Sequence, residues 1–311
     1  MEAVNVMDST IDPRTLLTTP NLVEVGVAGD AVRRTLHGAR TTFVRVFEIH
    51  VDAPPSSAPA ELAAGEIRIV GKPASEEIAL RAVSAAVSLS GGAPVTGFSL
   101  PELFELAGQV DRLTPLASRL RAAGMEAVAE CPVDADLADL AGAVLAARAG
   151  GLAVQRLTVT LQPAGERLLP GIAHSAPGAS ALDVEGRLAI VTKASELQDR
   201  VGGFRAFAPL ARTLSVAGPT TGYADIKQIA LARTVVRNIA SIQVDWPLYG
   251  PKLAQVALTT GADDVDGVAA VETNALGRRR TALEEIKNNI RAAGLEAFER
   301  DARFGTRAAL A

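Results

Sequence analysis

The sequence predicts an α/β protein folded as a TIM-like (β/α) barrel, partial or nearly closed, with an N-terminal helical prefix. From about residue 41 onward, short β-rich runs alternate with helix-like segments, and no long polar linker separates them. Such alternation implies a parallel sheet covered by helices. The number of βα units favours a barrel over an open sheet. We therefore divide the chain into a helical prefix, residues 1–40, and a barrel, residues 41–311.

The expected elements follow one another at short intervals. The strands are expected at Thr42–Val51, Glu66–Val70, Pro94–Phe98, Glu126–Glu130, Ala153–Leu161, Phe204–Leu210, Ile242–Trp246, Val265–Val271 and Glu296–Arg300. The helices are expected at Leu22–Leu36, Ser75–Ser90, Leu113–Ala123, Leu137–Ala149, Tyr223–Ile239, Pro251–Thr260 and Leu283–Ala293. Ser99 with Glu102 and Thr281 with Glu284 have the spacing of helix capping boxes. The prefix helix is expected to cover one end of the barrel, and Pro163–Ala181 reads as the longest loop.

Composition excludes several classes of function. Hydrophobic residues make up 48% of the chain, enough for a large core. A net charge of −4 gives no basic surface for nucleic acid. We find no signal peptide and no apolar run that could span a membrane, so we expect a cytoplasmic protein. The one cysteine, Cys131, excludes an internal disulfide and any metal site that needs several thiolates of this chain.

The carboxyl ends of the strands are where barrels bind ligands. We expect His50 as a candidate general base, with Glu130 or Glu272 as a candidate acid. The candidate ligand-binding residues are Asp52, Gln162, Arg212 and Trp246. We predict no metal site, because GADDVDG (261–267) reads as a helix-to-strand turn with short acidic caps. No nucleophile elbow, Walker or Rossmann glycine pattern is present.

Several longer segments resemble one enzyme family. They are LHGARTTFVRVFEIHV (36–51), LQDRVGGFRAFAPLA (197–211), GPTTGYADIKQIALAR (218–233), NIASIQVDWPLYGPKLAQVALTTGADDVDG (238–267) and ERDARF (299–304). Together they resemble aminofutalosine synthase, a radical S-adenosylmethionine (SAM) enzyme of menaquinone biosynthesis. Dehypoxanthine futalosine cyclase and the deazaflavin synthase subunits share the pattern less well. The resemblance implies the radical-SAM type of (β/α) barrel.

The chain departs from this family where its cofactors bind. In the family the first strand leads into CxxxCxxC, whose thiolates hold a four-iron cluster. The three cysteine positions fall at Pro55, Pro59 and Leu62, none of which can bind iron. A glycine pair and a histidine–proline that help to hold SAM are replaced by GKPAS (71–75), with a cation at Lys72. The family's paired glutamates become Glu272–Thr273.

These departures lead to two hypotheses. The first is a degenerate, cluster-less paralogue without a cofactor, which acts as a binding or partner subunit. Its ligand would be a small molecule of the futalosine pathway, or its partner an authentic aminofutalosine synthase. The second is an enzyme that uses the same pocket for non-radical acid/base chemistry on a nucleoside-like or chorismate-derived molecule.

Overall fold

The computed structural model describes residues 12–160, 183–212, 221–271 and 282–307. The strands are β1 (Arg40–His50), β2 (Glu66–Val70), β3 (Val95–Ser99), β4 (Ala127–Pro132), β5 (Arg156–Val159), β6 (Ala206–Ala211), β7 (Ser241–Asp245), β8 (Asp264–Ala269) and β9 (Glu296–Arg300). The helices are α1 (Pro13–Thr18), α2 (Leu22–His37), α3 (Glu76–Leu89), α4 (Leu100–Ala107), α5 (Val110–Ala122), α6 (Leu140–Ala149), α7 (Val184–Val201), α8 (Gly222–Val235), α9 (Trp246–Leu258) and α10 (Ala282–Ala292).

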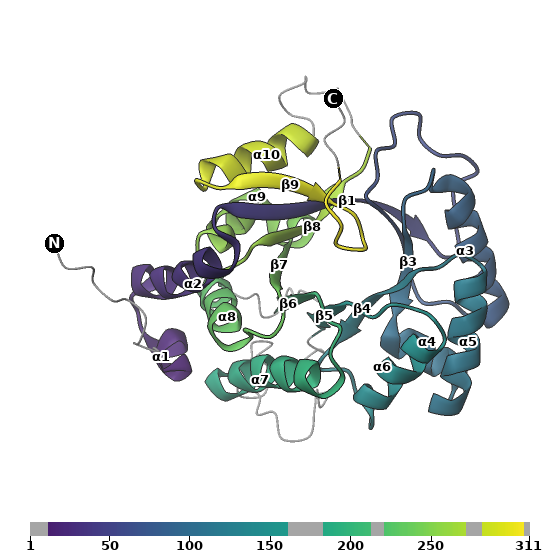
Figure 1. The fold of residues 1–311 in the computed structure, drawn as a ribbon, viewed down its shortest axis with the longest axis horizontal. Helices are drawn as coiled ribbons and strands as arrows, with labels where there is room; N and C mark the ends of the chain where they lie inside the picture. Colours follow the sequence, from purple (N-terminus) through teal and green to yellow (C-terminus); the bar gives the residue numbers. More distant parts are fainter. Residues whose placement is uncertain (1–11, 161–182, 213–220, 272–281, 308–311) are drawn as a thin grey trace.

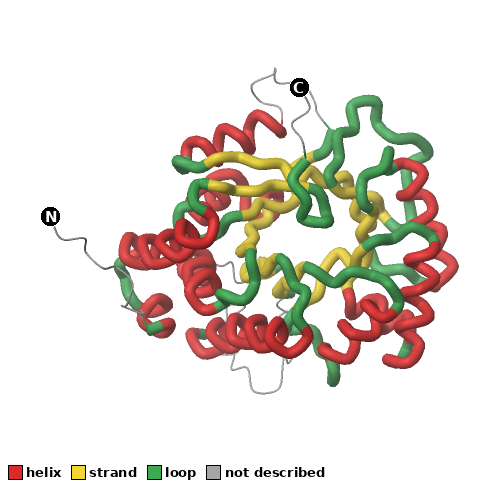
Figure 2. Tube along the Cα trace, in the orientation of Figure 1, coloured by secondary structure: helices red, strands yellow, loops and turns green. Residues whose placement is uncertain are grey.

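The first eight strands form a closed parallel barrel. Strands β2 to β8 follow one another around the ring, and β1 closes it by pairing with both β8 and β2. Figure 2 shows the strands as a ring surrounded by helices. The sequence left open whether the barrel was partial, and the β1–β2 ladder from Val46 to His50 shows that it is closed.

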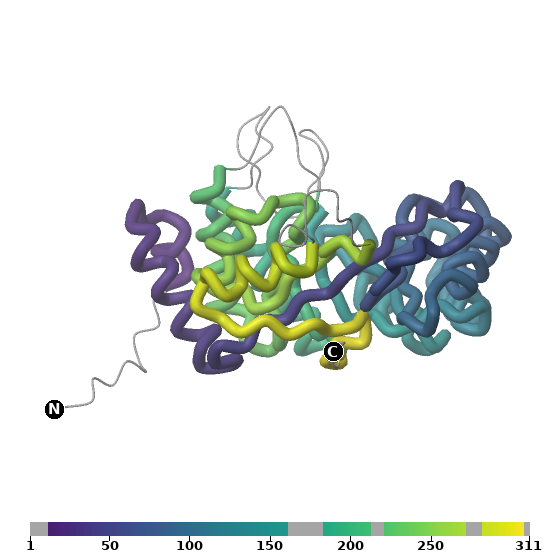
Figure 3. Tube along the Cα trace, turned by 90° about the horizontal axis from the view of Figure 1, so that it is seen from above, coloured from purple at the N-terminus to yellow at the C-terminus, as the bar shows by residue number. Residues whose placement is uncertain are grey.

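The ninth strand lies outside the ring. β9 pairs in parallel with the first half of β1, from Arg40 to Val44, whereas β2 pairs with its second half. Figure 1 and Figure 3 both show β9 running alongside β1 at the edge of the barrel. The chain after β9 then turns across the amino-terminal end of the barrel, where Ala302 donates its N–H to Gly65 and Phe304 lies beside the first residues of β2 to β5.

Successive side chains along each strand point alternately outward to the helices and inward to the centre of the barrel. On β2, Ile67 and Ile69 pack outward into the hydrophobic core between strands and helices, while Glu66 and Arg68 point into the barrel. On α3, Ala79, Val83 and Ala86 have the helical spacing that places them together against this core. The apolar core therefore surrounds the barrel, and the centre of the barrel is polar.

One expectation about the helices was wrong, and one long helix was not predicted. The prefix helix α2 does not cover an end of the barrel: it packs on the outside against α8, where Gly29 approaches the backbone of Thr260. Helix α7 was not predicted, although Ile190, Ala194 and Leu197 have helical spacing and Asp183 caps its first turn. The nine expected strands are all present, with ends that differ by a few residues. The predicted loop Pro163–Ala181 lies outside the described residues.

Candidate functional site

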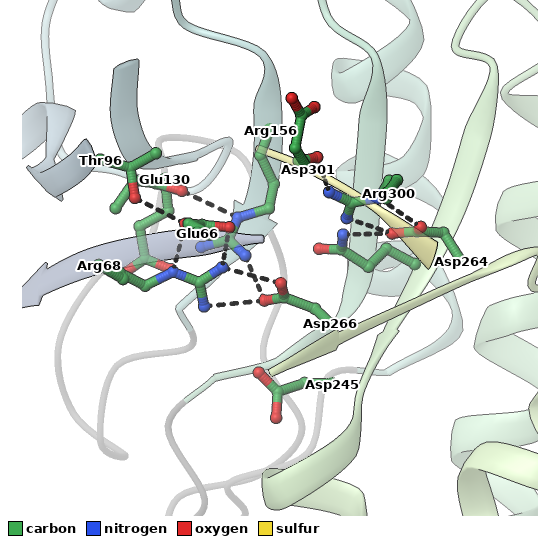
Figure 4. A network of polar contacts seen from close by, with 12 residues as sticks. Glu66, Arg68, Thr96, Glu130, Arg156, Asp245, Asp264, Asp266, Arg300 and Asp301 are labelled. Atoms are coloured by element: carbon green, nitrogen blue, oxygen red, sulfur yellow. Dashed lines mark hydrogen bonds and ion pairs between the residues drawn. The ribbon is translucent and has the colours of Figure 1, made fainter. Parts of the chain in front are cut away.

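The centre of the barrel holds a buried network of ion pairs (Figure 4). Asp266 of β8 lies between two guanidinium groups: Arg68 of β2 donates to both carboxylate oxygens, at 2.8 and 3.0 Å, and Arg156 of β5 donates to one. Arg68 also forms two hydrogen bonds with Glu66, at 2.7 and 2.9 Å, and Thr96 donates to the same carboxylate. Four strands are thus joined through side chains in the middle of the barrel.

Pairing keeps these buried groups charged. Burial alone would raise the pKa of Asp266, but the charges of Arg156 and Arg68 hold it well below its usual range. Burial also acts on Glu66, whose pKa is nevertheless lowered by Arg68. Arg156 is less well compensated, because burial and the neighbouring Arg68 lower its pKa. The network is therefore a set of mutually dependent charges rather than a proton donor and acceptor tuned for neutral pH.

A second buried group lies nearer the amino-terminal end of the barrel. Asp264 of β8 accepts two hydrogen bonds from Arg300, at 2.6 and 2.7 Å, and one each from Gln243 and Thr42. Arg300 is the last residue of β9 and pairs with Val44 in the ladder between β9 and β1, so its ion pair ties the ninth strand to the barrel. The acidic residues of GADDVDG thus enter buried ion pairs, and among the described residues no group of potential metal ligands is found.

A third cluster lies at the carboxyl ends of the strands and contains two of the predicted residues. Arg212, directly after β6, is 2.8 Å from Glu130 of β4 and 2.9 Å from Asp245, the last residue of β7. Burial would lower the pKa of Arg212, but the two carboxylates raise it. Asp245 also accepts the N–H of Leu248 and so caps α9. Glu130 and Arg212 therefore do meet, in an ion-pair cluster that includes a carboxylate we did not predict.

The predicted base lies apart from this cluster. His50 ends β1 with 57% of its side chain exposed, and its Nδ1 is 3.9 Å from Asp52, which is 65% exposed. The Asp52 N–H also donates to that ring nitrogen, at 3.3 Å. The contacts of His50 are with Asp52 and the turn at Gly71, not with Glu130. The structure therefore pairs the histidine with the predicted Asp52 at the rim of the barrel.

Of the three remaining predicted residues, only Trp246 lies in the described part of the chain. Trp246 begins α9 directly after Asp245 and is partly buried against the hydrophobic core. Gln162 and Glu272 lie outside the described residues.

The loop after β1 does not fit an iron–sulfur cluster. Pro55 is exposed and Pro59 half-buried, and neither side chain offers a metal ligand. Leu62 packs against the hydrophobic core and forms a β-bridge with Val271. Cys131 is fully buried on β4, and burial raises the pKa of its thiol to about 12, so it is neither accessible nor ionised.

The turn after β2 is the one at which the sequence predicts the loss of SAM-binding residues, with a cation at Lys72. The Nζ of Lys72 lies 2.5 Å from the carboxylate of Glu105 on α4, and both side chains are more than half exposed. The turn at Gly71–Lys72 therefore supplies no carboxylate for an ammonium group, and its charge is engaged at the surface.

Sequence reasoning missed most of the central network. Arg68, Arg156, Asp264 and Asp266 were not candidates. The sequence pattern could have identified them, because GEIRI and DDVDG carry charges at alternate positions of otherwise apolar strands. Charges on alternate residues of a strand share one face, and in a barrel that face is the inner one.

Comparison with known proteins relates part of the chain to futalosine-type enzymes. Residues 206–310 match the family described as the CofH/MqnC C-terminal region. An aminodeoxyfutalosine synthase of Thermus thermophilus is 38% identical over 98 residues, which are 29% of this chain and 26% of that protein. The aminodeoxyfutalosine synthase of Streptomyces coelicolor is 30% identical over 135 residues, 37% of this chain and 35% of that protein. The matches thus span about a third or less of the curated relatives.

Solved structures show the same fold. A methylornithine synthase, PylB, superimposes with a TM-score of 0.59 at 12% identity, covering 92% of this chain and 93% of that one. HydG, a maturase of the [FeFe]-hydrogenase, gives a TM-score of 0.56 at 10% identity, covering 91% and 70%. The fold is therefore a closed parallel TIM-like barrel like that of these two proteins. Residues 206–310 are distantly similar to CofH and MqnC, and a sequence with a single cysteine contains no CxxxCxxC motif.

Proposed function

We propose that this protein is a cluster-free relative of the aminofutalosine synthases that binds a ligand or a partner enzyme instead of performing radical chemistry. One observation carries the proposal. The loop that would hold the cluster has prolines at two ligand positions and a core-packed leucine, Leu62, at the third. Thiolates are what such clusters require.

The charges in the barrel support the part of the proposal that concerns the loss of catalysis. Arg68, Arg156 and Arg212 each pair with a carboxylate of a strand that is not their direct neighbour in the ring. A ligand that used these groups would have to break pairs that are already desolvated, and removing one partner of such a pair is costly. The paired charges therefore support a structural role for these arginines, in place of the binding of a polar substrate.

Anaerobic reconstitution with iron and sulfide tests the loss of the cluster. The aminodeoxyfutalosine synthase of Thermus thermophilus, treated in parallel, serves as the positive control. We expect this protein to retain no stoichiometric iron or acid-labile sulfide and to leave SAM uncleaved. A bound cluster that cleaves SAM would overturn the proposal.

Binding is tested separately. We expect either a saturable thermal shift with a futalosine-pathway intermediate, without turnover, or co-elution with an aminodeoxyfutalosine synthase at the summed mass in light scattering. Independent elution together with no shift by any intermediate would refute the binding role.

The rim pair of His50 and Asp52 favours one alternative, an enzyme of acid/base chemistry. A solvent-exposed imidazole beside a carboxylate has the composition and accessibility of a general base. If this function holds, turnover of a nucleoside-like or chorismate-derived substrate is expected to be lost in His50→Ala and kept in Ser84→Ala, an exposed change on α3. Equal turnover in both variants would exclude His50 as the base.

A further inference from the structure

A cavity of about 130 Å³ lies at the amino-terminal end of the barrel, opposite the candidate site. It is bounded by the starts of three strands: Arg40 and Thr42 of β1, Arg205 just before β6, and Ser241 of β7. Phe304, from the segment that follows β9, forms another part of its wall. The cavity is thus lined by segments far apart in sequence.

Two guanidinium groups of this cavity lack an acidic partner among the described residues. Arg40 donates to the hydroxyl of Thr306, at 2.6 Å, and stacks on Phe298. Arg205 is exposed, and the hydrogen bonds described for it involve only its backbone. Buried arginines elsewhere, such as Arg45, Arg68 and Arg156, pair with carboxylates. Two positive charges without carboxylates therefore border one hollow.

The other charges at the cavity are already neutralised. Arg300 is held by Asp264. The carboxylate of Asp263 accepts from Arg233 and from the N–H of Ile242, and its second oxygen is 3.5 Å from Nε2 of His37. His37 also directs Nε2 at the carbonyl of Ala240, 2.9 Å away. The excess charge of the lining is therefore positive.

We propose that this cavity is a binding site for a phosphate-sized oxyanion, held by Arg40 and Arg205. Guanidinium groups bind phosphate oxygens through charge-assisted hydrogen bonds, and the hydroxyl of Ser241 adds a neutral donor. The volume is close to the roughly 150 Å³ that accommodates a benzene ring, so an ion of five heavy atoms fits. A phosphomonoester would place only its phosphate inside.

Calorimetric titration with inorganic phosphate, at constant ionic strength set by potassium chloride, tests the site. We expect saturable binding by the wild-type chain, weakened about tenfold or more in Arg40→Gln and in Arg205→Gln. Arg237→Gln, an exposed charge outside the lining, removes the same net charge and is expected to keep the wild-type affinity. The melting temperature of each variant without phosphate verifies its fold.

Parallel titrations distinguish the source of the phosphate group. Tighter binding of glycerol 3-phosphate than of inorganic phosphate would assign the site to a phosphomonoester, and equal binding to the free ion. Absence of saturable binding up to tens of millimolar phosphate would overturn the proposal. So would undiminished binding by folded Arg40→Gln and Arg205→Gln, or an equal loss in Arg237→Gln.

Discussion

At the scale of single residues, the charges inside the barrel behave as parts of pairs. Asp266 is the clearest case, since it contacts two arginines from different strands. Its carboxylate compensates two buried cations, and its own pKa is lowered by them after burial has acted in the opposite direction. The negative charge of Asp266 thus lowers the free-energy cost of burying the two arginine charges.

We predict that Asp266→Asn destabilises the fold strongly. Removing the charge leaves buried Arg156 without its paired carboxylate and Arg68 with Glu66 alone, and breaking a buried pair typically costs about 3–5 kcal/mol. Urea unfolding followed by circular dichroism measures the change. Glu77→Gln, in the exposed first turn of α3, is the control and is expected to leave the midpoint nearly unchanged. Equal midpoints for the two variants would contradict the paired role of Asp266.

Cys131 gives a second prediction at this scale. Because its thiol is buried and its pKa is raised to about 12, it is expected not to react with an aromatic disulfide reagent at pH 8. One thiol per chain should appear only after unfolding in guanidinium chloride. Rapid reaction of the native protein would show that β4 opens or that the thiol is accessible.

At the scale of elements, the sequence predicted what depends on local pattern. All nine strands were expected, because most are short apolar runs bounded by turn residues. The inner-face charges were missed because their role depends on closure of the ring: Arg68 meets Asp266 only when β2 and β8 lie on either side of β1. His50 and Glu130 could be placed at strand ends, but their separation depends on the position of each strand around the ring.

The packing of α2 depends on one glycine. A Cβ at Gly29 would lie 1.9 Å from the carbonyl oxygen of Thr260, whereas at Gly26 the nearest atom is a methyl carbon at 3.3 Å. We predict that Gly29→Ala displaces α2 and costs about 1–3 kcal/mol despite its better helix propensity. Gly26→Ala, in the same helix, should be near neutral or stabilising. Thermal unfolding of both variants measures the difference, and equal stability would show that α2 adapts without cost.

At the scale of the whole molecule, the barrel retains its shape while its two ends differ in chemistry. The carboxyl end has paired charges and a proline loop where the related family has a cluster. The amino end has a hollow bordered by arginines without carboxylate partners in the described part of the chain. Between the two ends, the ion pairs of Asp266 and Asp264 join strands from different parts of the ring, so the stability of the barrel depends on the ionisation of its centre.

This dependence gives a prediction about acid. The lowered pKa values of Asp266 and Glu66 mean that their stabilisation is complete above the unfolded values, near pH 4, and is lost as pH falls through the folded values. The contribution of Asp263 to the pH dependence of stability has the opposite sign. Burial raises its pKa despite Arg233, so the folded state binds the additional proton and stability falls as pH rises through the folded value.

The contributions of Asp266 and Asp263 to stability can be distinguished by the slope of the free energy of unfolding against pH. Asp266→Asn is expected to flatten the rise of stability with pH below about pH 4, because the variant no longer releases that proton on folding. Asp263→Asn is expected to steepen the net rise from about pH 4 upward, because it removes an opposing contribution. Urea unfolding at a series of pH values measures both slopes. Slopes that change in the same direction in the two variants would contradict the opposite effects assigned to Asp266 and Asp263.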